Sequence, residues 1–249
     1  MKSKITLTKN VARLVEAGEA LIRRPAGMPG MGLVHGETGY GKTTAITWHG
    51  NRCNAVYVRA MATWTPAAML GSILSELGRN ARGSCAQMMD EIIEALAMSG
   101  RPLYVDEADY LVDSKRMSES LRDIHDMATV PVVLVGMGGI DQRLAHRKQL
   151  TGRVMQDTRF EPLDIEDTAK IAEDLVEGLD VGPDLLAHLH QEAKGSTRLI
   201  VVGLARIEQN ARNRGMDAIA LSDWGKRALF TGNAPTAPAG KVAALRGAR

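Results

Sequence analysis

The stretch GETGYGKT, residues 36–43, constrains the possible folds of this chain more than any other. Its spacing is G-x-x-x-x-G-K-[ST], with Gly36, Gly41, Lys42 and Thr43 at the fixed positions. The short apolar run before it predicts a buried strand, and the run after it can begin a helix. A strand, a glycine-rich turn and a helix N-terminus surround phosphate oxygens with backbone N–H groups and the positive end of a helix dipole. The stretch therefore predicts a phosphate-binding loop.

Two carboxylates at the end of another apolar strand complete the expected site. The run Leu103–Val105 is followed by Asp106 and Glu107. Asp106 is expected to hold Mg²⁺ through water beside Thr43, and Glu107 to polarise the water that attacks the γ-phosphate. Lys42 would reach the β- and γ-phosphates. The residues expected to bind ATP and Mg²⁺ are Gly36, Glu37, Thr38, Gly39, Tyr40, Gly41, Lys42, Thr43, Thr44 and Asp106, with Thr43 and Asp106 at the metal.

The composition limits the partners and the location. Lys and Arg number 31 against 29 for Asp and Glu, so the formal net charge is only +2. A nucleic acid would therefore have to be held by a local basic patch. Cys53 and Cys85 match neither a disulfide framework nor a metal-site spacing, which favours a reducing cytosol. We expect a cytoplasmic protein, because the first residues lack a signal-peptide pattern and no apolar run could span a bilayer.

Apolar strands alternate with amphipathic helices in the first two thirds of the chain, which predicts an α/β fold with a parallel sheet between two helical layers. Strands are expected at 31–35, 54–59, 103–105, 132–135 and 158–161, and helices at 8–23, 43–48, 66–78, 86–98, 119–128 and 140–150. After Pro162 the strands are expected to stop, with helices at 165–178, 183–194, 197–214 and 222–230.

This pattern divides the chain into three parts. A nucleotide-binding core is expected at 1–161 and an all-helical lid at 162–230. A tail at 231–249 is rich in Ala, Pro and Gly and is expected to be flexible. Its charged residues are all basic: Lys241, Arg246 and Arg249.

These motifs resemble those of the AAA+ ATPases, in particular their initiator-like clade, which has an extra helix between the second and third strands. The likeness covers roughly residues 5–230, with a Walker A motif at GETGYGKT, a Walker B motif at LYVDE, a helical lid, and GSTR (195–198) at the start of a lid helix. The resemblance implies a P-loop AAA+ fold and an ATPase that prefers adenine, since the N-K-x-D motif of guanine recognition is missing. It also implies that Arg198 is a sensor 2 residue that contacts the γ-phosphate.

The resemblance further implies a homo-oligomer, because in these ATPases an arginine finger from the neighbouring subunit completes the site. The finger precedes the fifth strand, where Arg153 fits best, with Arg147 and Arg143 as alternatives. One departure concerns the end of the fourth strand, which usually carries a polar sensor 1 residue and here reads VGMGG, residues 135–139. Without that side chain the attacking water is held less well, so we expect slow hydrolysis and a nucleotide that acts mainly as an assembly switch.

Within the clade, the pattern LVGMGG…QRL…GRV…F.PL is most similar to the transposition activators of Mu-like phages, the B protein type, and to related transposon target-selection ATPases. This resemblance implies an ATP-dependent helical filament on double-stranded DNA, bound without sequence specificity, that recruits a transposase in a bacterial host cytoplasm. The Mu-type protein has a DNA-binding domain before its ATPase, whereas only a short segment precedes Gly36 here. DNA binding is therefore expected from the ATPase body.

Basic residues that could contact DNA form two groups. A solvated, charged surface is the alternative explanation for each of them. A second function therefore stays open, a P-loop scaffold that assembles with protein partners without DNA, and other DNA-directed loaders also fit. The first group is Arg143, Arg147, Lys148, Arg153 and Arg159, and the second, in loops or at the ends of elements, is Arg59, Arg79, Arg82, Lys115 and Arg116.

Overall fold

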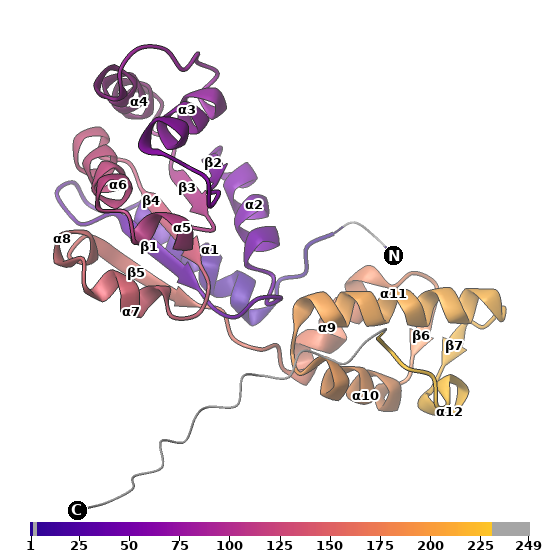
Figure 1. Ribbon diagram of the computed structural model, residues 1–249. Helices are drawn as coiled ribbons and strands as arrows, with labels where there is room; N and C mark the ends of the chain where they lie inside the picture. The colour runs from indigo at the N-terminus through magenta and orange to yellow at the C-terminus, as the bar shows by residue number, and fades with distance from the viewer. Residues whose placement is uncertain (2–3, 231–249) are drawn as a thin grey trace, which may run out of the picture.

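The computed structural model of this chain describes Met1 and residues 4–230. Figure 1 shows that these residues form an α/β core, which contains the main sheet, and a smaller, mostly helical lid beside it. The core and the lid are connected by the segment that follows β5. The basic tail expected at 231–249 lies outside the described residues.

A five-stranded sheet with the strand order β2-β3-β4-β1-β5 forms the centre of the core. Every neighbouring pair of strands is parallel, and all residues of β1, β3 and β4 are buried, as expected for inner strands covered on both faces. The predicted α/β fold with a parallel sheet is thus confirmed. The strands are β1 (Met31–His35), β2 (Val56–Arg59), β3 (Leu103–Asp106), β4 (Val132–Gly136) and β5 (Val154–Arg159).

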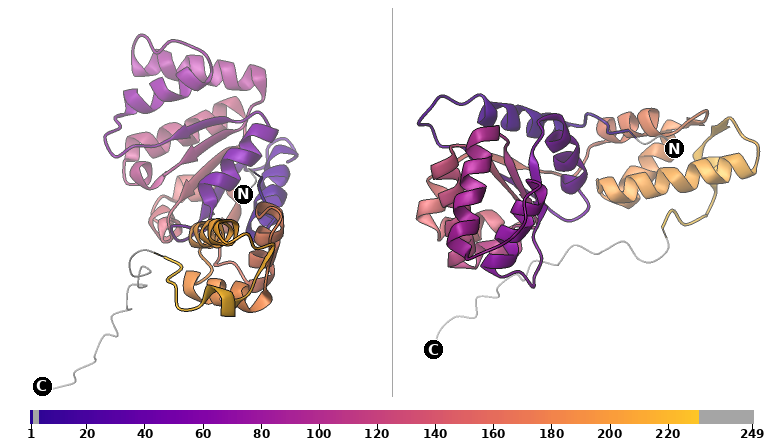
Figure 2. Two further views of the ribbon diagram at one scale, coloured as in Figure 1. Left: turned by 90° about the vertical axis from the view of Figure 1, so that its right-hand side faces the viewer. Right: turned by 90° about the horizontal axis from the view of Figure 1, so that it is seen from above.

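Helices cover both faces of this sheet (Figure 2). On one face, α1 and α2 pack through side chains such as Leu14 and Ile46. On the other face, α3, α4 and α6 pack through Ile73, Ile92 and Ile124. The two helices α3 and α4 both lie between β2 and β3 in the chain, as predicted. The core helices are α1 (Lys9–Ile22), α2 (Lys42–Arg52), α3 (Pro66–Glu76), α4 (Cys85–Ser99), α5 (Asp109–Val112), α6 (Lys115–Ala128), α7 (Ile140–Ala145) and α8 (Lys148–Thr151).

The lid packs around an apolar core of its own, which includes Leu185, Leu189 and Ile200. The prediction that strands stop after Pro162 is wrong, because β6 and β7 form a short parallel pair in the lid. Strands of two residues are too short to produce an alternating pattern, so the sequence does not reveal them. The lid elements are α9 (Ile165–Leu175), β6 (Asp180–Val181), α10 (Pro183–Ala193), α11 (Thr197–Asn213), β7 (Ala218–Ile219) and α12 (Leu221–Trp224).

Two predicted boundaries near the end of the core are also wrong. The fifth strand begins at Val154 rather than near Thr158, because it is a partly exposed edge strand of mostly polar residues (VMQDTR) that no apolar run marks. The helix predicted at 140–150 is divided into α7 and α8 by His146 and Arg147. An apolar pattern therefore located these elements but not their limits.

The residues at helix ends explain two further differences between the predicted and the observed helix boundaries. Helix α6 begins at Lys115 rather than at 119, because the Ser114 hydroxyl accepts the Met117 N–H and caps the helix. The helix predicted at 222–230 is only α12, which ends at Trp224 and is followed by Gly225 with a φ of +65°. The single turn α5 was not predicted.

The segment before α1 and the first residue of α1 contact the lid. Lys4 pairs with Asp174 of α9 at 2.5 Å. Lys9 pairs with Glu166 at 2.9 Å, and its backbone N–H donates to the buried Asp167. Exposed ion pairs contribute about 0–1 kcal/mol each, so their main effect here is to position the segment against the lid.

Two buried histidines link the stability of the core to pH. The Gly30 N–H donates to His125 Nε2 at 3.3 Å, and His125 Nδ1 lies 2.8 Å from the Val130 carbonyl oxygen. His49 Nδ1 lies 2.8 Å from the Tyr104 hydroxyl. Burial lowers the pKa of both imidazoles below the ordinary value, so both are neutral at pH 7.

We therefore expect the protein to be less stable at pH 5 than at pH 7. A histidine whose pKa is lower in the folded than in the unfolded chain stabilises the fold fully above the unfolded pKa of about 6.5. That stabilisation is lost as the pH falls through the folded pKa, because the unfolded chain takes up the proton first. Thermal unfolding at several pH values measures the change. Replacing both histidines by glutamine should make the fall in Tm between pH 7 and pH 5 smaller. A wild-type Tm that stays constant between pH 7 and pH 5 would contradict the expectation.

Candidate active site

The loop predicted to bind phosphate lies between β1 and α2, at the edge of the sheet where the parallel strands end. Gly39 and Gly41 have φ of +91° and +86°, in the left-handed region that other residues rarely adopt. A Cβ atom on Gly39 would lie 2.7 Å from Ser196 Oγ, because the lid approaches the loop at this point. The loop thus has the curled backbone that phosphate binding requires.

Lys42, the first residue of α2, turns its ammonium group into the loop. Its Nζ donates hydrogen bonds to the carbonyl oxygens of Gly36 (2.6 Å) and Glu37 (3.0 Å). Burial lowers the pKa of Lys42, while the carboxylates of Asp106 and Glu107 act in the opposite direction. The loop therefore encloses a cation that could pair with phosphate oxygens.

Asp106, at the end of β3, is 3% exposed, and both of its carboxylate oxygens accept hydrogen bonds. Oδ1 accepts the Glu107 N–H at 2.9 Å. Oδ2 accepts the hydroxyls of Thr43 (3.0 Å) and Tyr57 (2.9 Å). Burial and, after it, the negative charge of Asp106 raise the pKa of Tyr57 to about 12, so the phenol keeps its proton and donates it to the hydrogen bond. Thr43 and Asp106, the two predicted metal residues, are thus in direct contact.

This donor set fits Mg²⁺. Hydroxyl and carboxylate oxygens are its preferred protein ligands, and it usually keeps several waters. Thr43 would bind the metal directly and Asp106 through water, with both side chains held at the wall of one cavity. When held by these residues, Mg²⁺ would neutralise the negative charge that develops on the phosphates.

Glu107 follows Asp106 and has a φ of +53°, which is uncommon for a residue with a side chain. This backbone conformation costs about 1–2 kcal/mol, and such strain is concentrated at functional sites. The Glu107 carboxylate pairs with the Arg59 guanidinium at the end of β2 at 3.1 Å. The predicted water-activating group therefore lies at the cavity wall, paired with a cation from the neighbouring strand.

Met137 follows β4, where the resembling ATPases carry a polar sensor 1 side chain. Its N–H donates to Asp109 Oδ2 at 2.7 Å, and its sulfur lies 3.5 Å from the Thr38 hydroxyl. Asp109 also pairs with Arg143 of α7. The end of β4 is thus tied to the turn that follows the two Walker B carboxylates, and the expectation of slow hydrolysis stays a prediction.

The lid contacts the loop through the start of α11. The Arg198 N–H donates to the Gly39 carbonyl oxygen at 3.0 Å, and the Ser196 hydroxyl donates to the same oxygen at 3.4 Å. The Arg198 side chain is exposed and lines the same cavity as Lys42 and Asp106. The structure therefore brings the predicted sensor 2 residue to the loop.

A cavity of about 1080 Å³ opens between the loop, the two carboxylates, the N-terminal segment and the lid. Among the described residues, three buried side-chain polar atoms have no hydrogen-bond partner, and two of them, Thr6 Oγ1 and Thr197 Oγ1, belong to residues that line this cavity. Unpaired buried hydroxyls are costly, so they favour a polar ligand. The apolar part of the cavity wall suits the nucleobase of a bound nucleotide. It includes Ile5, Val11, Ile171, Leu175, Val201 and Val202.

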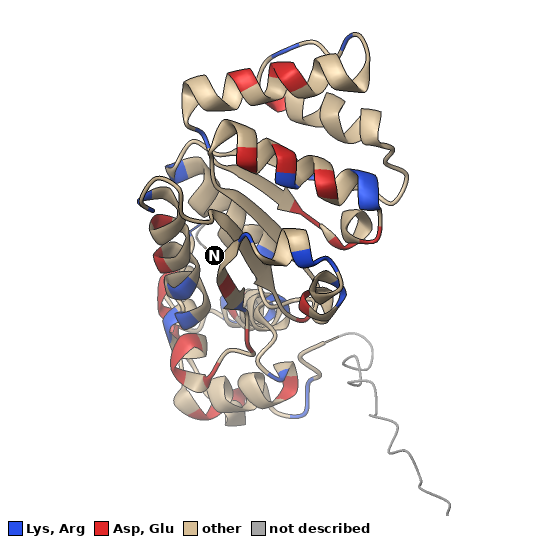
Figure 3. Cartoon of the chain, turned by 90° about the vertical axis from the view of Figure 1, so that its left-hand side faces the viewer, with Lys and Arg blue, Asp and Glu red and all other residues tan. Residues whose placement is uncertain are grey.

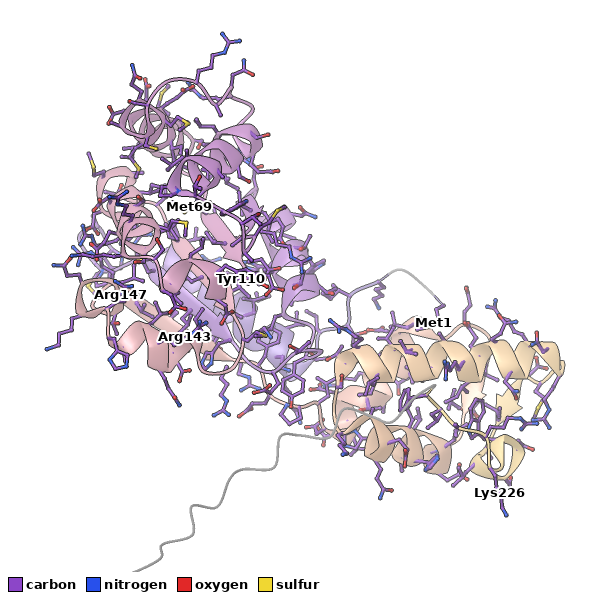
Figure 4. All side chains as sticks on the ribbon, viewed as in Figure 1. Met1, Met69, Tyr110, Arg143, Arg147 and Lys226 are labelled. Carbon is purple, nitrogen blue, oxygen red and sulfur yellow. The ribbon has the colours of Figure 1, made fainter. Side chains whose placement is uncertain are left out.

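The three candidate finger arginines lie elsewhere in the core. Arg153 is at the start of β5, on the opposite edge of the sheet from the loop, where its guanidinium pairs with Asp126 at 2.6 Å. Arg143 and Arg147, labelled in Figure 4, both contact the turn after α5. None of the three lines the cavity of its own chain. Contact with the nucleotide of a neighbouring subunit involves a second chain and stays a prediction.

Two side chains that contact the Walker B carboxylates were not among the predicted site residues. Tyr57 contacts Asp106 and Arg59 contacts Glu107, and both belong to β2. Their spacing of two residues places them on the same face of a strand, which is readable from the sequence. The strand order places β2 next to β3, and this order cannot be read from the sequence.

Residues 26–144, which contain the loop and both carboxylates, match the AAA domain family. The fold is that of a P-loop AAA+ ATPase. The same fold is found in the ORC1 protein of Aeropyrum pernix in complex with DNA, at 19% identity and a TM-score of 0.61 over 88% of this chain and 63% of that chain. The ORC2 protein of Aeropyrum pernix, in ADPNP and ADP complexes, shares 16% identity with a TM-score of 0.67 over 88% and 67% of the two chains. CDC6P from Pyrobaculum aerophilum shares 19% identity with a TM-score of 0.65 over 90% and 68%.

These AAA+ structures are longer than this chain, which spans 63% of the first of them. At such identities the likeness establishes the fold, and the AAA domain match supports ATPase activity. No curated protein matches the chain in sequence. Within the described residues, no helix combines the length and the apolar character needed to cross a membrane.

Proposed function

We propose that this AAA+ protein binds and hydrolyses Mg²⁺-ATP and that its ATP-bound form binds double-stranded DNA without sequence specificity. One observation carries the first part of the proposal. The hydroxyl of Thr43, the last residue of the loop motif, donates to Asp106 at the wall of a cavity that also contains the Lys42 ammonium and the Glu107 carboxylate. The groups needed for phosphate binding, metal binding and water activation thus converge in one place.

The chain's own residues divide the reaction between them. The Lys42 ammonium would leave the loop carbonyls for phosphate oxygens, which carry more negative charge. Glu107 would accept a proton from the attacking water once its carboxylate is released from Arg59. Arg198 would add positive charge at the γ-phosphate from the lid side of the cavity.

Support for DNA binding comes from a group of cations around the start of α6. Lys115 and Arg116 begin α6, Lys148 begins α8, and Arg147 donates to the Asp113 carbonyl oxygen at 2.8 Å. Lys115, Arg116 and Lys148 are exposed and form no ion pair with a carboxylate of the described residues. Unpaired cations of this kind can bind DNA phosphates and release counterions.

Several other basic residues predicted to contact DNA already have carboxylate partners. An ion pair would have to break before such a residue could bind a phosphate, which lowers its contribution. Figure 3 shows the side of the core that carries α6 and α8, where Lys and Arg lie among Asp and Glu rather than in a continuous basic surface. The pairs are Arg59 with Glu107, Arg79 with Glu91, Arg143 with Asp113, and Arg153 with Asp126.

A small basic group on a chain of net charge +2 binds DNA weakly on its own. Assembly of several ATP-bound subunits would add their contacts and make binding avid. We therefore propose a homo-oligomer or filament on DNA, with Arg153 of each subunit at its neighbour's nucleotide and a transposase recruited to the assembly. Its support is the sequence resemblance, together with the DNA-bound state of the similar ORC1 structure.

A binding assay on random duplex DNA tests this function. Fluorescence anisotropy, with a slowly hydrolysed ATP analogue, with ADP and without nucleotide, should show tight binding only with the ATP analogue. Sedimentation of the same mixtures should show oligomers that DNA enlarges. ATP-driven oligomers that do not bind DNA at low salt would support the protein scaffold instead, and tight binding by a nucleotide-free monomer would exclude the assembly model.

Charge reversal at the start of α6 should weaken DNA binding without weakening ATP binding. We expect Lys115→Glu/Arg116→Glu to lower DNA affinity by ~10-fold or more and to reduce the slope of log affinity against log salt by about two, one for each lost phosphate contact. The control is Lys226→Glu/Arg227→Glu, which reverses an identical dipeptide in the lid, where Figure 4 labels Lys226. Because Arg227 donates to the Asp223 and Trp224 carbonyl oxygens, the Tm of this control is measured as well. Equal losses in both double variants would indicate a general charge effect rather than a site.

A further inference from the structure

Tyr57 is the side chain of β2 that reaches the metal-binding carboxylate. In the parallel register Tyr57 lies beside Tyr104, two residues before Asp106 on the same face of the sheet. Its phenol extends along the strand, and its hydroxyl donates to Asp106 Oδ2 at 2.9 Å. The ring is half-buried among the apolar side chains between the sheet and α2, so its direction is fixed by packing.

The two hydroxyls on Asp106 Oδ2 differ in what they do when metal is present. The Thr43 hydroxyl is itself an expected Mg²⁺ ligand, so it would turn from Asp106 toward the metal. Tyr57 lies on the other side of the carboxylate, in the neighbouring strand, and does not line the cavity. Its hydrogen bond can therefore persist while the metal is bound.

We propose that Tyr57 is a positioning residue for Mg²⁺ binding, because it fixes the plane of the Asp106 carboxylate. The inference rests on the proposed ATPase function. With the Glu107 N–H on Oδ1 and the Tyr57 hydroxyl on Oδ2, both oxygens keep a donor after Thr43 has turned away. The carboxylate then presents its remaining lone pairs in one direction. Hydrogen-bond partners of metal ligands typically change metal affinity by about 10- to 100-fold when they are removed.

Strand β3 also carries a tyrosine, Tyr104, whose hydroxyl contacts a core residue rather than the site. Tyr104 is the register partner of Tyr57, and its hydroxyl lies 2.8 Å from His49 Nδ1 in the core. Tyr104 is 1% exposed, and among the described residues the hydroxyls that donate to Asp106 are those of Thr43 and Tyr57. Removing either hydroxyl is the same chemical change on adjacent strands, which makes Tyr104→Phe a matched control for Tyr57→Phe.

The test is a Mg²⁺ titration of nucleotide binding, measured with a fluorescent, slowly hydrolysed ATP analogue. In EDTA we expect Tyr57→Phe to bind the analogue within ~2-fold of wild type, because loop and lid contacts are unchanged. The Mg²⁺ concentration that gives half of the metal-dependent increase in affinity should rise ~10-fold or more. Hydrolysis measured at low Mg²⁺ should fall and should recover when Mg²⁺ is raised. Tyr104→Phe should keep the wild-type Mg²⁺ dependence even if its Tm is lower.

The outcomes separate this inference from the proposed function. If wild-type protein shows no Mg²⁺-dependent binding of the analogue, both fail. If wild type shows it and Tyr57→Phe has the same Mg²⁺ dependence, the function stands and the role of Tyr57 is overturned. Equal shifts in Tyr57→Phe and Tyr104→Phe also overturn it, because the effect would then come from loosening of the core.

Discussion

Lys42→Ala is expected to bind ATP at least ~30-fold more weakly than the wild-type protein. Removing one partner of a buried, hydrogen-bonded charge pair costs about 2–5 kcal/mol, and here the lost partner is the cation enclosed by the loop. Isothermal titration with ATP and Mg²⁺ measures the loss.

The control for Lys42→Ala is Lys226→Ala, which removes an exposed lysine from the lid. Both variants should fold, which their Tm values without nucleotide would show. Nucleotide should raise the Tm of the control and of wild type but not that of Lys42→Ala, because a ligand stabilises only a protein that binds it. A folded Lys42→Ala protein with normal ATP affinity would falsify the assignment of the loop.

Glu107→Gln should keep ATP binding and lose hydrolysis by ~10² or more, the usual contribution of a general base. The amide has the size of the carboxylate but cannot take a proton from water. ATP-dependent assemblies should therefore last longer than those of wild type. Single-turnover hydrolysis and equilibrium binding, measured on the same preparation, separate the two effects.

The variant Glu91→Gln is a suitable control for Glu107→Gln. Glu91 also pairs with an arginine, Arg79, but it lies on α4, away from the cavity. Its replacement should leave hydrolysis unchanged. If Glu107→Gln hydrolyses ATP at the wild-type rate, another group activates the water, and Asp109, which holds the end of β4, would be the next residue to replace.

The parts of the site that depend on short stretches of sequence were predictable. The loop and the Asp106–Glu107 pair each form within a few consecutive residues, and the end of a buried strand fixes where they point. That Thr43 and Asp106 would meet followed from the chemistry of the metal, and the 3.0 Å contact agrees with it.

The rest of the site depends on which segments become neighbours. Tyr57 and Arg59 act on the carboxylates because β2 is placed beside β3, and no local pattern encodes a strand order. The β6–β7 pair has the same origin, since it joins distant segments over only two residues each. The lining of the cavity by Ile5 and Thr6 depends on the ion pairs that hold the N-terminal segment against the lid.

The shared hydrogen bonds on the Gly39 carbonyl have a mechanical consequence. Helix α11 starts at this carbonyl and continues for 17 residues, about 25 Å at 1.5 Å per residue. A helix of this length moves as a rigid rod, so a small rotation at its loop end displaces its other end by a larger distance. If the loop shifts by a fraction of an ångström to admit phosphates, the start of α11 would move with the Gly39 carbonyl. The displacement would then grow along the helix toward its far end and α12. We therefore expect a probe at the outer end of α11 to respond when the loop is occupied, although that end lies far from the loop.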